Sequence, residues 1–240
     1  MTAIVRSELL ALRTLRSTWA VPAVLLTLVA VIVVASFADA GAEGLRTPAE
    51  LREVLVASSG IMSAVGLALF AATRTAGEYR HGTITHRLLA TPRRIRRLAV
   101  TLLVYGSLGL VMGALAAILA IGIGRPMVAA KNLTLEIGSE HVAGILLSVV
   151  LFSLLGVAAG VITRSQPVAV GAVFGLFIAE KLLSLVIGDA TAYLPYGLLY
   201  VLHGIGGSTM SWILAAVLLT ATTALVIGIA GTMLARRDVT

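Results

Sequence analysis

The chain has 240 residues, of which 59% are hydrophobic and only 12% are charged, and its mean hydropathy is +1.04. Soluble domains carry about 25% charged residues, so this composition excludes an ordinary soluble domain and predicts an all-α, multi-pass membrane protein. We assign the net charge of +7 to membrane topology and anionic lipid rather than to nucleic acid, and the absence of cysteine excludes disulfides and thiolate chemistry.

Residues 1–18 place three arginines among apolar residues. At helical spacing the arginines gather on one side, which predicts a helix lying in the inner membrane interface. A merely basic lead-in to the first span is the alternative. The first span is expected at 19–38. Ala38-Asp39-Ala40 resembles a signal-peptide cleavage site, but an apolar run of about 20 residues exceeds the roughly 7–15 of a signal peptide, which favours a retained span.

Residues 39–53 are polar and mixed in charge. Thr47, Pro48 and Glu50 have the pattern of a helix start, with Thr47 as the N-cap, Pro48 at the first helical position and Glu50 reaching back to the cap. The pattern predicts a short outer helix that leads into a second span at 54–73.

The segment 74–97 carries seven arginines and two histidines between two long apolar runs. A basic segment in this position is typical of a cytoplasmic loop between membrane spans. Thr91-Pro92 repeats the helix-start pattern. The last four arginines of the segment are expected at the inner headgroup level, where they can bind anionic lipid: Arg93, Arg94, Arg96 and Arg97.

Four more spans are expected, at 98–124, 142–163, 168–187 and 210–235. Residues 164–167 form a short turn, because proline ends one helix and can begin the next. Six spans place both termini on one side of the membrane. That side carries thirteen Lys and Arg residues against four on the other, which predicts cytoplasmic termini and a cell-membrane protein.

Residues 188–209 are too apolar for a free loop and too interrupted by proline and glycine for a full span. If they form a helix, Tyr196, Tyr200 and His203 share one face. Tyrosines favour the membrane interface, so we expect a broken or re-entrant segment at the outer surface. An interfacial anchor without a further role is the alternative. For the histidines of the chain in general, a solvated or lipid-facing position is expected.

Three glycine pairs spaced four residues apart predict close helix packing, with a dimer contact or a moving helix seam as the alternatives: Gly109 and Gly113, Gly156 and Gly160, Gly171 and Gly175. Glu180 and Lys181 are the only charges inside a predicted span. Each would cost roughly 2.5–3.5 kcal/mol at mid-membrane. A structural or snorkelling role and a functional role along a translocation path both fit these two residues.

The sequence contains no H-E-x-x-H, G-x-S-x-G or phosphate-binding G-x-x-x-x-G-K-[ST] motif. His81 and His86 are five residues apart, a poor spacing for two metal ligands on one helix face. We therefore expect no enzyme activity, no cofactor and no metal in this chain. Energy for transport would come from a separate subunit or from an ion gradient.

The sequence G-E-Y-R-H-G-T-I at 77–84, followed by L-L-A-T-P-R-R at 88–94, resembles the loop between the second and third spans of bacterial type-2 ABC transporter permeases. The basic amino-terminal helix, the six spans and the broken outer segment also match that family. The resemblance implies two permease copies, or two related permeases, and two cytoplasmic ATPase subunits that bind ATP and Mg. It also implies that the loop is a coupling helix docked on the ATPase, and that the cargo is a drug, peptide, lipid or glycan.

The residues expected to contact the ATPase are Glu78, Tyr79, Arg80, His81, Thr83 and Arg87. The function that this resemblance favours is the permease subunit of an ATP-driven exporter. An ion-coupled transporter with Glu180 as its proton carrier is the alternative, and a membrane enzyme or immunity-type protein is the third.

Overall fold

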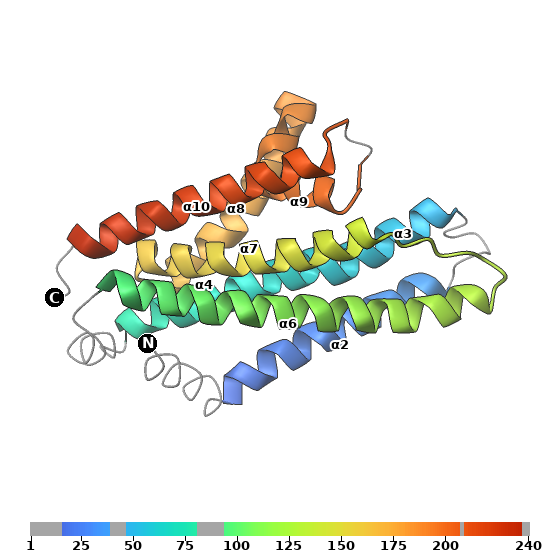
Figure 1. The fold of residues 1–240 in the computed structure, drawn as a ribbon, viewed down its shortest axis with the longest axis horizontal. Coiled ribbons are helices and arrows are strands. Elements are labelled where there is room, and N and C mark those ends of the chain that lie inside the picture. The colour runs from blue at the N-terminus through green and yellow to red at the C-terminus, as the bar shows by residue number, and fades with distance from the viewer. Residues whose placement is uncertain (1–15, 39–46, 81–93, 207–208, 237–240) are drawn as a thin grey trace.

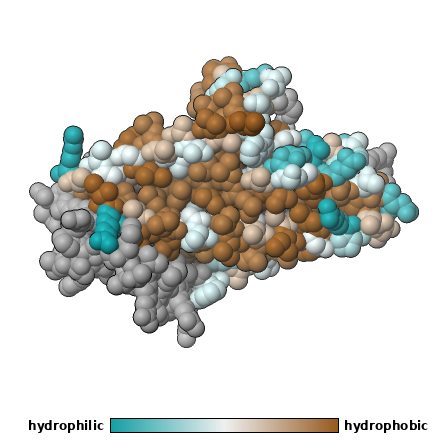
Figure 2. Space-filling view, in the orientation of Figure 1, coloured by the Kyte–Doolittle hydropathy of each residue, from teal (hydrophilic) through white to brown (hydrophobic). Residues whose placement is uncertain are grey.

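The computed structural model describes residues 16–38, 47–80, 94–206 and 209–236. Every regular element within these ranges is a helix, and six helices are long and apolar enough to cross a membrane. On the face shown in Figure 2, apolar side chains cover the middle of the molecule and hydrophilic ones lie toward its two ends. The predicted all-α fold with six candidate spans is therefore confirmed.

The helices follow one another as α2 (Arg16–Ala38), α3 (Pro48–Val56), η1 (Ala57–Ile61), α4 (Met62–Arg80), α6 (Arg94–Ala129), α7 (Ser139–Thr163), α8 (Gln166–Ile187), η2 (Gly188–Tyr193), α9 (Pro195–Leu202) and α10 (Trp212–Arg236). The element η1 is a single π-helical turn and η2 is a 3-10 helix. Within its described residues, the segment predicted to be broken contains two short helices, η2 and α9, and a turn at 203–204.

The helix start predicted at Thr47 is confirmed. The backbone N–H of Glu50 donates to Thr47 Oγ1 at 3.2 Å, and the N–H of Thr47 donates to Glu50 Oε2 at 3.2 Å. From this capping box the chain runs without interruption through α3, η1 and α4. The short outer helix and the second span are therefore one helical run with a π-helical turn inside it.

The basic segment is less of a loop than the sequence predicted. Residues 74–80 belong to α4, and α6 already begins at Arg94. Residues 81–93, with the helix start predicted at Thr91-Pro92, lie outside the described residues, as do residues 1–15, which carry most of the predicted interfacial helix.

Helix α7 lies at the centre of the bundle because its glycines admit close neighbours. A Cβ added at Gly156 would lie 2.1 Å from the carbonyl oxygen of Ala68, and one at Gly160 would lie 2.7 Å from Thr75 Cβ, both on α4. Gly109 of α6 is similarly close to the backbone of α7, 3.0 Å from Val150 Cα. Two of the three predicted glycine pairs therefore pack within the chain.

Figure 1 shows α2, α4, α6, α7 and α10 running lengthwise along the molecule, while α8 leaves this bundle at an angle. The end of α4, the start of α6, the α7–α8 turn and the end of α10 lie together at the left of the view. We call this the arginine-rich end. The predicted turn is present there: Arg164 ends α7 with a positive φ of 54°, and Pro167 lies in the first turn of α8.

Candidate functional site

Three successive residues at the end of α4, Gly77, Glu78 and Tyr79, each contact a different neighbour. Glu78 forms an ion pair with Arg97 of α6. Its Oε2 accepts a hydrogen bond from Arg97 Nη2 at 2.5 Å. The Arg97 side chain is only 8% exposed. The Arg97 guanidinium therefore turns inward to the one carboxylate of the basic segment, and the predicted position at the headgroup level stays a prediction.

Tyr79 and Gly77 connect α4 to the turn between α7 and α8. The guanidinium of Arg164 lies 5.2 Å from the centroid of the Tyr79 ring, which is within the range of a cation–π contact. The side-chain amide of Gln166 donates to the carbonyl of Thr73 at 3.2 Å. It occupies the space beside Gly77, where an added Cβ would lie 2.6 Å from Gln166 Nε2.

We call Glu78, Tyr79, Arg97, Arg164 and Gln166 the clamp. Of the residues predicted to contact an ATPase, the structure brings Glu78 and Tyr79 together here. Arg80 is the last residue of α4, and the other three lie outside the described residues: His81, Thr83 and Arg87.

Sequence reasoning missed the partners of Glu78 and Tyr79 within the chain. The useful signal was that Glu78 is the only acidic residue among seven arginines in 74–97, which predicts an ion pair but does not identify the arginine. Arg164 and Gln166 carry no such signal, because their contacts arise only when α7 and α8 pack beside α4.

A second group of residues surrounds the start of α9. Glu180 of α8 is only 5% exposed. Its Oε2 accepts hydrogen bonds from the backbone N–H groups of Tyr196 at 2.9 Å and Gly197 at 3.2 Å. These amides are in the first turn of α9 and have no partner within that helix, so Glu180 acts as a helix cap supplied from another element.

Lys181 faces a different direction from Glu180, as expected for neighbours on a helix. Its side chain is exposed, and its Nζ lies 4.4 Å from the centroid of the Tyr200 ring. The two charges inside the fifth span therefore have separate surroundings, one inside the protein and one at its surface.

Tyr196 fixes α9 against α7 and α8. Its ring lies 5.1 Å from the centroids of both Phe152 and Phe177, and its hydroxyl donates to the carbonyl of Val173 at 2.9 Å. Burial, and then the charge of Glu180, raise the pKa of Tyr196. The expectation of an interfacial tyrosine is therefore wrong for Tyr196, which is 2% exposed.

His203, at the end of α9, is completely buried. Its Nε2 shares a hydrogen bond of 3.1 Å with Ser148 Oγ of α7, and a Cβ added at Gly60 in the π-helical turn would lie 2.4 Å from the same nitrogen. Burial, with a smaller effect of the His141 charge, lowers the pKa of His203 to about 3, so the imidazole is neutral at physiological pH. The expected solvated or lipid-facing position is wrong for this histidine.

Among the described residues, no group of three His, Asp or Glu side chains is placed to hold a metal ion. Comparison of the chain with protein-family models and with curated proteins found no match. A role for these two groups of residues therefore has to be proposed from their geometry and from the sequence of the basic segment.

Proposed function

We propose that the chain is the transmembrane permease subunit of an ATP-driven ABC exporter, which forms the translocation path as a dimer and is coupled to separate cytoplasmic ATPase subunits. Six candidate spans and the sequence of 77–94 support this proposal. The sequence has no phosphate-binding loop of its own, so the energy would come from the partner chain, which would bind ATP and Mg.

The observation that carries the proposal is the clamp. It attaches the end of α4, where the segment 81–93 begins, to α6 through Glu78 and Arg97 and to the α7–α8 turn through Tyr79 and Arg164. A partner can move the spans only through contacts that differ between its own nucleotide states. The clamp joins α4, α6, α7 and α8, so a displacement of the segment 81–93 would move all four helices together.

We propose two roles for the predicted coupling residues. Glu78 and Tyr79 are used inside the chain, so they hold the segment in place and are positioning residues. Arg80, His81, Thr83 and Arg87 are the residues that we propose to contact the ATPase. Both termini and this segment would then lie in the cytoplasm of a cell-membrane protein, in agreement with the arginine excess.

The test is purification of the tagged permease with its ATPase from the native host. Replacement of Arg80 and Arg87 by alanine should reduce the recovered ATPase several-fold, because exposed ionic contacts contribute about 0.2–1 kcal/mol each. Glu78→Ala should retain the ATPase but weaken the stimulation of ATP hydrolysis by the permease. Arg125→Ala, at the opposite end of α6, is the control.

Wild-type recovery of the ATPase by the Arg80 and Arg87 double variant would contradict the coupling role. The basic segment would then serve topology and lipid binding alone.

One observation supports the alternative function, which is ion-coupled transport through Glu180. The Glu180 carboxylate is buried within a candidate span, and its Oε1 has no hydrogen-bond partner among the described residues. Against it, Oε2 already holds two amides of α9, which gives Glu180 a structural role. Transport that persists without any ATPase but collapses with the proton gradient would favour the alternative.

A further inference from the structure

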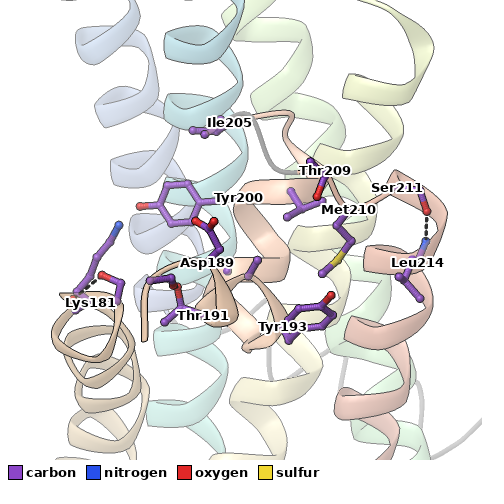
Figure 3. A pocket seen from close by; sticks show the side chains of 16 residues that line it. Lys181, Asp189, Thr191, Tyr193, Tyr200, Ile205, Thr209, Met210, Ser211 and Leu214 are labelled. Carbon is purple, nitrogen blue, oxygen red and sulfur yellow. Dashed lines mark hydrogen bonds between the residues drawn. The ribbon is translucent and has the colours of Figure 1, made fainter. Parts of the chain in front are cut away.

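A cavity of about 820 Å³ lies where α8, η2, α9 and the start of α10 meet. Figure 3 shows Lys181 on its α8 side and Ser211 and Leu214 on its α10 side, with Asp189, Tyr193 and Tyr200 from the broken segment between them. Its volume falls within the range of about 300–1,000 Å³ that is typical of small-molecule sites.

The cavity presents one positive and one negative group. Among the described residues, neither the Lys181 ammonium nor the Asp189 carboxylate forms an ion pair with another side chain, and both residues are exposed. The Lys181 ammonium is held over one face of Tyr200. Two opposite charges at the wall of one cavity match a ligand that itself carries both signs and has no net charge.

The helix surfaces next to the cavity are strongly apolar. Leu185 and Val186 of α8 are 82% and 81% exposed, and Ile213 of α10 is 71% exposed. In a helix that spans a membrane such side chains face acyl chains. A ligand in the cavity can therefore extend an apolar chain along α8 or α10 without leaving an apolar environment.

We propose that this cavity binds the headgroup of a zwitterionic phospholipid of the ethanolamine type. Its phosphate would lie at Lys181, its primary ammonium would donate hydrogen bonds to Asp189, and its acyl chain would follow the exposed side of α8. A quaternary choline group fits less well, because it has no N–H for Asp189 and because Lys181 already covers the Tyr200 ring. An anionic lipid has no positive group that could pair with the Asp189 carboxylate.

The proposal requires only that the chain spans a membrane, and it does not depend on ATP-driven export. It is tested by native mass spectrometry of the purified chain in a maltoside detergent, titrated with lysophosphatidylethanolamine. The expected result is one bound lipid per chain. Lys181→Gln and Asp189→Asn should each weaken binding about fivefold, as for loss of one solvent-accessible ionic contact. Arg236→Gln, at the far end of α10, should bind as the wild type does.

Three further measurements decide the ligand class. Free phosphoethanolamine should bind much more weakly than the lysolipid; equal binding would overturn the proposal in favour of a water-soluble solute. Lysophosphatidylcholine should also bind more weakly, and equal binding would remove the role of Asp189. Lys181→Arg keeps the positive charge and should retain the lipid, whereas wild-type binding by Lys181→Gln would show that the lipid binds elsewhere. Because no ATPase is present, failure here would leave the coupling proposal intact.

Discussion

Glu180 and Lys181 are adjacent in the sequence, yet each side chain interacts with a different part of the broken segment. The carboxylate of Glu180 accepts two backbone hydrogen bonds at the start of α9, and the ammonium of Lys181 lies over Tyr200 one helical turn further on. Both contacts hold α9 to α8. A charge inside a span is costly, and here the partial positive charge of a helix start offsets the cost for Glu180.

Replacement of Glu180 by alanine should destabilise the protein by about 1–3 kcal/mol, because the buried amide of Tyr196 and the partly buried amide of Gly197 lose their acceptor. Glu180→Gln should cost less, since both N–H groups donate to the same oxygen and an amide oxygen in its place can still accept both hydrogen bonds, although without the negative charge. The free energy of unfolding in detergent micelles measures both effects. Lys181→Ala is the matched control, because its side chain is exposed and it should change stability by less than about 1 kcal/mol. A Glu180→Ala variant as stable as the wild type would remove the capping role.

The residues of the candidate site could be predicted only in part. The sequence identified Glu78, Glu180 and Lys181, because charged residues are rare enough in this chain to attract notice. It did not identify what they contact, because the amides of α9 and the guanidinium of Arg97 come from other elements. The burial of Tyr196 and His203 was also missed, since amphipathic side chains look alike in sequence whether they face an interface or a core.

At the scale of elements, the seam between α4 and α7 depends on residues without side chains. Gly156 brings α7 against the carbonyl of Ala68, and Gly160 does the same one turn further on, beside Thr75. Gly171 and Gly175 have the same spacing on α8, but nothing among the described residues lies within 4 Å of a Cβ added at either. Spacing alone therefore does not distinguish a packed glycine pair from an exposed one.

Gly156→Ala should separate α4 from α7 and destabilise the protein by about 1–3 kcal/mol, as other overpacked sites do. Gly171→Ala provides a matched control in a neighbouring helix. It adds the same methyl group to open space and should be neutral or slightly stabilising, because alanine has the higher helix propensity. Thermal unfolding of the two variants in the same detergent tests the difference. If Gly156→Ala has the same unfolding temperature as Gly171→Ala and the wild type, the contact between α4 and α7 can accommodate the added methyl group without separation of the helices.

The spans themselves were predictable, because long uncharged runs have few alternatives to a membrane helix. The residues at which the helices begin and end were less predictable. The helices continue past the apolar runs into 74–80 and 94–97, where the ion pair of Glu78 with Arg97 holds both ends together. Tertiary contacts of this kind extend a helix beyond the point at which its composition changes.

For the whole molecule, the helix ends divide into two groups. The arginine-rich end gathers Arg97 and Arg164 with the last residue of α10, Arg236, while Arg125 and Lys131 lie near the opposite end of α6. The asymmetry counted along the sequence is therefore also an asymmetry in space, and it predicts which end faces the cytoplasm.

Single-cysteine labelling tests this orientation, because the chain has no native cysteine. Thr85→Cys, in the basic segment, should not react with a membrane-impermeant maleimide in intact cells. Thr134→Cys, exposed after α6 at the opposite end, should react. Labelling of both variants after the membrane is opened shows that each cysteine is accessible. The reverse pattern would place the arginine-rich end outside and would also contradict docking of a cytoplasmic ATPase there.

The π-helical turn η1 has a consequence for changes in chain length. A π-helical turn accommodates one residue more than the α-helical turn that it replaces, since its hydrogen bonds join residues five apart instead of four. Deletion of Ala57 would convert η1 to ordinary α-helix while Gly60 stayed beside His203. Deletion of one residue within α4 would instead rotate all that follows by about 100° and turn Glu78 away from Arg97. Related chains that differ by one residue in this region should therefore differ at 57–61.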